Sequence, residues 1–162
     1  MASKLARTLR VDLKMGLTAV LSAFVTVALI GAVPVATAHE GATGIVKERM
    51  DRFKASKTSL QTMKQALKSE DWTVLQTEAE QLNVWANEMV DYFPEGSNQA
   101  PSEARDAVWQ DWDGFVRAVQ AFGVTTQDLV SAVDNRSVNE ATLAFKATAQ
   151  SCKACHDSFR KD

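Results

Sequence analysis

Apolar side chains recur every three or four residues in four separate stretches, the spacing of one face of an α-helix. The first stretch covers residues 43–69 and the second covers 71–92. The third begins near Ser102, and the fourth runs from Ser137 to Phe159. The sequence shows no sustained alternation of apolar and polar positions and no Asn-Gly or Asp-Gly hairpin turn between apolar runs, so it carries no strand signal. The pattern therefore predicts an all-α fold.

The residues between these stretches carry signals that begin and end helices. Asp71 is a favoured N-cap residue before the second stretch, and Ser137, with a glutamate three residues later, forms a capping box before the fourth. The segment 94–101 is rich in Pro, Gly, Ser and Asn and predicts a loop. Gly123 predicts a kink or a restart within the third stretch. Four amphipathic helices with short connections predict an antiparallel four-helix bundle, left-handed and up-down-up-down.

The first 38 residues differ from the rest. Four basic residues lead into an uncharged stretch at 15–35 and then an Ala-Thr-Ala site at 36–38, which together are the parts of a secretory signal peptide. A membrane anchor is the alternative, because the uncharged stretch approaches the roughly 20 residues that span a bilayer. Pro34 and the small residues after it favour cleavage after Ala38. We expect residues 39–162 to be exported to the periplasm as a domain that is not embedded in the membrane.

Removal of this segment changes the charge of the protein. The whole chain of 162 residues has 18 basic and 20 acidic residues and a net charge of −2. Four of the basic residues and one acidic residue lie in 1–38, so the remaining domain carries −5. A nucleic-acid-binding domain needs a basic surface, so a mildly acidic domain argues against a nucleic-acid partner.

The segment Cys152-Lys-Ala-Cys155-His156 carries the clearest chemistry. C-x-x-C-H is the attachment site of c-type haem. On a helix the two thiols share a face and can reach the two vinyl groups of haem, while the imidazole can ligate the iron. A disulfide oxidoreductase motif would stand in a βαβ pattern, a zinc site would need more ligands than His39 supplies, and a structural disulfide would not require His156. We therefore predict one covalent haem c, held through Cys152 and Cys155.

Several segments resemble the cytochrome c′ family, the four-helix class of c-type cytochromes. The similarity covers residues 42–162. It rests on the C-terminal Cys-Lys-Ala-Cys-His-Asp-Ser-Phe-Arg at 152–160, Arg49-x-x-x-Phe53, the loop Phe-Pro-Glu-Gly-Ser at 93–97 and Trp-Gln-Asp-Trp-Asp-Gly-Phe at 109–115. The resemblance implies His156 as the proximal iron ligand, with Cys152 and Cys155 as the thioether anchors.

The resemblance also assigns roles to three arginines. Arg160, one turn after His156, would lie near the proximal face and could steady a ligand or a haem propionate. Arg49 would meet a haem propionate, which would account for a guanidinium on an apolar stripe. Arg105 is a second candidate propionate partner, and a surface charge is the equal alternative.

Phe53 falls where the family places the residue over the sixth iron position. Phenylalanine cannot ligate, so the iron would be five-coordinate, in an apolar pocket that admits a small gas. Met50 stands three residues earlier; packing against the haem edge is its simpler role, and ligation in a low-spin electron-transfer cytochrome is the alternative. We expect binding of NO and CO or electron exchange with a redox partner protein rather than enzymatic turnover. The resemblance also implies a homodimer through the first two helices.

Overall fold

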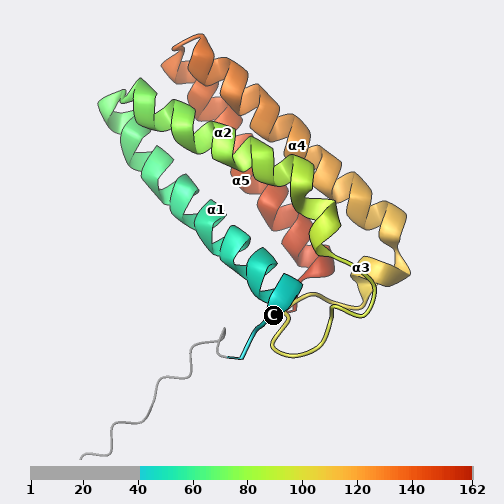
Figure 1. Ribbon diagram of the computed structural model, residues 1–162. Helices are drawn as coiled ribbons and strands as arrows, with labels where there is room; N and C mark the ends of the chain where they lie inside the picture. Colours follow the sequence, from blue (N-terminus) through green and yellow to red (C-terminus); the bar gives the residue numbers. More distant parts are fainter. Residues whose placement is uncertain (1–40, 162) are drawn as a thin grey trace, which may run out of the picture. The chain divides into compact units, whose positions relative to one another are not determined.

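The computed structural model describes residues 41–161 as a bundle of four long helices that run alternately up and down (Figure 1). A turn of 3-10 helix, η1 (Met89–Tyr92), and a four-residue helix, α3 (Ala107–Gln110), lie between the second and third long helices. The long helices are α1 (Gly44–Ser69), α2 (Trp72–Glu88), α4 (Trp112–Asp134) and α5 (Val138–Phe159). The prediction of an all-α four-helix bundle is confirmed.

Short polar side chains begin three of the long helices. The Asp71 carboxylate accepts a hydrogen bond from the backbone N–H of the third residue beyond it, at 3.2 Å. The Ser137 hydroxyl does the same for α5 at 3.4 Å. Both caps were expected from the sequence. Asp111 caps α4 through the N–H of Gly114 at 3.0 Å, and a Cβ at that glycine would overlap the Asp111 carboxylate.

Two features expected in the third helical stretch, a start near Ser102 and a restart at Gly123, were wrong. No helix begins near Ser102, because this residue is buried and its hydroxyl binds the Ala104 N–H and a guanidinium from α1. Helix α4 also runs through Gly123 without a restart. The hydroxyl of Thr126 donates to the Gly123 carbonyl inside the helix at 2.9 Å, and packing of the buried face overrides the weak helix propensity of glycine.

The two ends of the bundle are filled differently. At the end of the bundle where short turns connect α1 to α2 and α4 to α5, aliphatic side chains form a closed core. Its members include Met63, Leu75, Leu129, Val133 and Ala141. At the opposite end aromatic side chains predominate, and a cavity opens between α1 and α5.

The predicted signal peptide, 1–38, and its cleavage site lie outside the described residues. Within 41–161, no helix combines the length and the apolar character needed to cross a membrane.

Candidate haem-binding site

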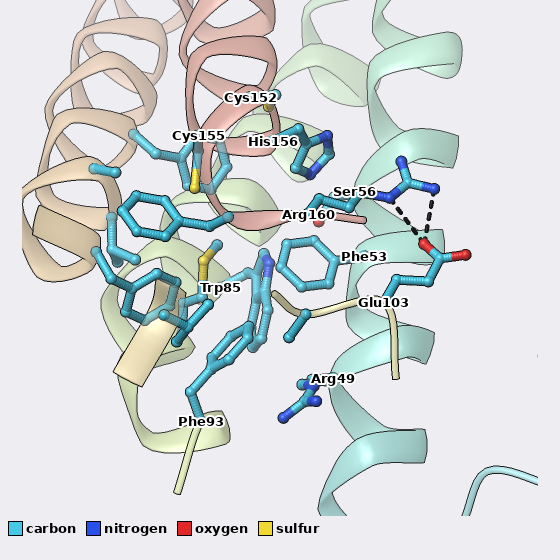
Figure 2. Close-up of a pocket in the computed structure, with 18 of the residues that line it drawn as sticks. Arg49, Phe53, Ser56, Trp85, Phe93, Glu103, Cys152, Cys155, His156 and Arg160 are labelled. Atoms are coloured by element: carbon cyan, nitrogen blue, oxygen red, sulfur yellow. Dashed lines mark hydrogen bonds and ion pairs between the residues drawn. The ribbon is translucent and has the colours of Figure 1, made fainter. Parts of the chain in front are cut away.

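Helix α5 presents the three residues of the C-x-x-C-H motif on one face. Cys152, Cys155 and His156 are half-buried, whereas the residues between and after them, at 153, 154, 157 and 158, are exposed. Positions three and four apart lie on the same side of a helix. Both thiols are free. Their arrangement places two sulfurs and an imidazole at a single surface, as Figure 2 shows.

This surface borders a cavity of about 540 Å³, within the range of roughly 300–1,000 Å³ found for cofactor pockets. Its walls come from α1, α2, α4 and α5 and from the segment before α3. Seven of the eight predicted site residues line it, namely Arg49, Met50, Phe53, Cys152, Cys155, His156 and Arg160. The size of the cavity and its motif therefore fit a large, flat, mostly apolar group such as haem.

Phe53 on α1 lies edge-on against His156, and both rings line the cavity. The centroids of the phenyl and imidazole rings are 6.0 Å apart and the ring planes meet at 71°. A flat group bound to the imidazole therefore has to enter between these rings. Phe53 offers no lone pair to a metal, so it can only cover the far side of such a group.

Burial shifts the acid–base behaviour of the motif. It raises the pKa of the Cys152 thiol, and it raises the pKa of the Cys155 thiol to about 11, with a smaller contribution from the charge of Cys152. It lowers the pKa of His156, helped by the charge of Arg160 and opposed by Asp157 and Glu103. The thiols are therefore protonated at neutral pH, and the imidazole favours the neutral form that ligates metals.

Arg49 is a buried cation at the end of the cavity nearest the loop 93–102. Only 2% of its surface is exposed, and its guanidinium lies 4.7 Å above the centre of the Phe93 ring. It donates to the carbonyls of Tyr92 and Ser97 and to the hydroxyls of Ser97 and Ser102. All four acceptors are neutral, and burial lowers the pKa of Arg49. No carboxylate of the described residues 41–161 pairs with Arg49, so its charge makes this end of the cavity suitable for a carboxylate.

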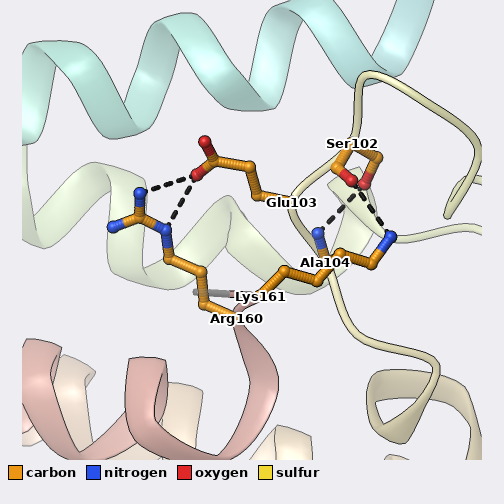
Figure 3. A network of polar contacts seen from close by, with 5 residues as sticks. All are labelled: Ser102, Glu103, Ala104, Arg160 and Lys161. Atoms are coloured by element: carbon orange, nitrogen blue, oxygen red, sulfur yellow. Dashed lines mark hydrogen bonds and ion pairs between the residues drawn. The ribbon is translucent and has the colours of Figure 1, made fainter. Parts of the chain in front are cut away.

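Arg160 is tied to the segment before α3 (Figure 3). Its guanidinium binds the Glu103 carboxylate at 2.7 and 2.8 Å. An isolated antiparallel bridge joins Ala104 to Arg160, and Lys161 donates its backbone N–H to the Glu103 carbonyl at 2.8 Å. The end of α5, one turn beyond His156, is therefore fastened to the rim of the cavity.

Arg105 is the predicted site residue that does not line the cavity. Its side chain donates to the backbone carbonyl of Asp157 at 3.1 Å. Met50 does line the cavity and is half-buried on α1.

Four residues of the site were not among those predicted from the sequence. Ser97 and Ser102 hold Arg49, and Glu103 holds Arg160. Trp85 lines the cavity and packs edge-to-face against Phe53, with ring centroids 5.3 Å apart. The signal for Trp85 was its place three residues after Leu82 on the apolar stripe, whereas the loop residues gave no periodic signal.

Comparison with known proteins shows the family of the chain. The family model for cytochrome c′ matches residues 44–160. The chain belongs to the cytochrome c′ family.

Two curated cytochromes c′ are similar in sequence. The protein from Alcaligenes xylosoxydans xylosoxydans is 35% identical over 66 residues, which are 41% of this chain and 52% of the relative. The protein from Rhodospirillum rubrum is 32% identical over 71 residues, 43% of this chain and 48% of the relative. The matched segments thus span about half the length of these relatives.

Solved structures of cytochromes c′ share the fold. The crystal structure from Thermochromatium tepidum has a TM-score of 0.68 at 20% identity, covering 73% of this chain and 95% of that chain. The nitric oxide complex of a variant of cytochrome c prime from Alcaligenes xylosoxidans has a TM-score of 0.67 at 26% identity, covering 73% and 94%.

Proposed function

We propose that the protein is an exported, periplasmic cytochrome with one haem c, attached covalently through Cys152 and Cys155 and ligated by His156. It binds a small gas such as NO or CO at a five-coordinate iron, or passes single electrons to a redox partner protein, without turning over a substrate. The observation that carries the proposal is the placement of both thiols and the imidazole on one wall of a cavity, opposite Phe53. Haem iron supplies the gas binding and the one-electron chemistry.

The residues of this chain supply the rest of the site. The two thiols would hold the macrocycle through thioether bonds to its vinyl groups and would set its orientation. The buried guanidinium of Arg49 offers its positive charge to a propionate. Phe53 would cover the side of the haem opposite His156 with a nonligating, apolar side chain, so a neutral diatomic molecule would be favoured there over a charged one.

The test combines three measurements on protein recovered from the periplasm. The mass of the intact chain should equal residues 39–162 plus one haem, and a haem stain should survive denaturing electrophoresis. The reduced protein should show one broad visible band, which is typical of five-coordinate iron, and NO and CO should change it. A chain without haem after correct export would refute the proposal.

The alternative is a six-coordinate electron carrier with Met50 as the sixth ligand. It is favoured by the position of Met50 on the cavity wall, one helical turn from Phe53. Sharp, split visible bands in the reduced protein would support this alternative over the five-coordinate state.

We also propose that two copies of the protein form a homodimer through α1 and α2. Sedimentation at increasing protein concentration tests it, and a monomer at every concentration would refute it.

A further inference from the structure

The indole N–H of Trp85 is a buried hydrogen-bond donor without an acceptor among the residues that the structure describes. The side chain is 2% exposed and lines the cavity. Trp109 provides the contrast, because its indole N–H donates to the carbonyls of Phe93 and Pro94, each at 3.1 Å. Buried N–H groups almost always have a partner. Because the side chain of Trp85 lines the cavity, a group bound there could supply the acceptor that this N–H lacks.

The neighbours of Trp85 indicate where that acceptor lies. The indole packs edge-to-face against Phe53 at 5.3 Å and against Tyr92 at 5.1 Å between ring centroids. Figure 2 shows its nitrogen at the end of the ring nearer Phe53 and His156, away from Arg49. The donor thus stands beside the residue that covers the sixth position, and not at the end where Arg49 offers its charge.

The carboxylate that follows Trp85 most closely along α2 takes part in an ion pair. Glu88 follows Trp85 by three residues, and its Oε2 atom lies 3.2 Å from the Arg52 guanidinium. Glu88 is therefore held in an ion pair, although the same Oε2 atom is buried and has no hydrogen-bond partner among the described residues.

The position of the Phe53 ring decides whether a group bound between Phe53 and His156 can reach the indole N–H of Trp85. Its ring contacts both the Trp85 indole and the His156 imidazole, and the indole nitrogen is covered in this arrangement. Any group that separates Phe53 from His156 moves the ring that packs on the indole. Occupation of the site on the Phe53 side would therefore bring the N–H within reach of the occupant.

We propose that Trp85 is a specificity-determining residue that donates its indole N–H to the small ligand bound on the Phe53 side of the site. The pocket would then be apolar except for one neutral donor. Such a pocket favours a neutral diatomic ligand whose outer atom accepts a hydrogen bond, over one of equal size that cannot. This inference rests on the proposed haem function.

The test uses the haem-loaded protein with CO as the probe. In Trp85→Phe we expect the C–O stretching band to move to higher wavenumber, because donation to the outer oxygen weakens the C–O bond. We expect CO to dissociate about 2- to 10-fold faster, the loss that corresponds to one neutral hydrogen bond. Trp109→Phe is the matched control: it makes the same substitution at an indole that donates to backbone, and should leave both measurements unchanged.

A second measurement needs no variant. Exchange of the native protein into D₂O should shift the C–O band if an exchangeable N–H is bonded to the ligand. An unchanged C–O band in Trp85→Phe together with no shift in D₂O would overturn the inference. The same two results are expected if the indole donates to a haem carboxylate instead of to the ligand. Absence of bound haem would instead refute the proposed function, so the two failures are distinguishable.

Discussion

The guanidinium of Arg49 on α1 donates to the hydroxyl of Ser102, 53 residues further along the chain, at 2.5 Å. The same guanidinium binds Ser97 and the Tyr92 carbonyl. One side chain therefore fastens the start of α1 to the loop that forms the rim of the cavity. Loss of these contacts would therefore destabilise both the loop and the start of α1.

Arg49→Met should lower the stability of the haem-loaded protein by about 2–5 kcal/mol, since several buried acceptors lose their donor. Urea unfolding followed by circular dichroism measures the change. Arg52→Met is the matched control, because Arg52 is exposed and pairs with Glu88 at 3.2 Å, and an exposed pair contributes about 0–1 kcal/mol. Equal losses in the two variants would contradict the anchoring role of Arg49.

Glu103→Gln should change the free energy of unfolding by less than about 1 kcal/mol, because the Glu103–Arg160 pair is partly exposed. The backbone bonds from Arg105 to Phe159 and from Lys161 to Glu103 do not depend on this carboxylate. The effect should fall further at high salt, which screens exposed charges. Urea unfolding at two ionic strengths checks both points, and a large, salt-independent loss would show that the prediction is wrong.

Phe53→Ala should speed the association of CO with the reduced protein, since the ring that faces His156 is removed. Stopped-flow mixing measures the rate. Phe145→Ala serves as the control, because Phe145 is a partly buried core residue on α5 that does not line the cavity. Rates that stay unchanged in Phe53→Ala would mean that Phe53 does not cover the gas site.

Met50→Leu should leave the visible spectrum of the reduced protein unchanged, because leucine preserves the volume of a packing residue. If Met50 ligates the iron, its replacement will instead convert sharp low-spin bands into a broad band. Absorbance spectra of the two purified proteins are sufficient to decide.

The haem-free chain should lose stability as the pH rises above 9. Burial raises the pKa of the Cys155 thiol from 9.0 to about 11 and also raises that of Cys152. The unfolded chain therefore releases these protons at lower pH than the folded chain, so the stabilisation is complete below pH 9 and is lost between about pH 9 and 11. Urea unfolding across this window should show a steeper loss than in a variant with Cys152→Ser and Cys155→Ser, and identical slopes would contradict the prediction.

The helices and the attachment motif could be predicted from the sequence because both are local patterns. The expected range 43–69 differs by one residue from the observed Gly44–Ser69, and the Asp71 cap depends on residues three apart. The spacing of Cys152, Cys155 and His156 on a helix fixes their common face without any knowledge of the fold.

The rim of the cavity could not be predicted in the same way. Ser102 and Glu103 act through partners more than 50 residues away, and no periodicity constrains the loop that carries them. The restart predicted at Gly123 was wrong for the opposite reason. The weak helix propensity of glycine is a local signal, and it was outweighed by the packing of α4 between α2 and α5. Arg105 was placed by resemblance alone, and its side chain bonds to Asp157 outside the cavity lining.

The separation of α1 from α5 by the cavity has a consequence for assembly. Helix α4 packs extensively against α2 and α5, whereas α1 packs mainly on α2 and touches α5 little. A prosthetic group in the cavity would supply the missing internal surface for α1. Attachment of the haem and packing of α1 against the α5 side of the bundle would then occur together. The backbone amides of α1 would be better protected from hydrogen exchange in the haem-bound protein than in the haem-free chain.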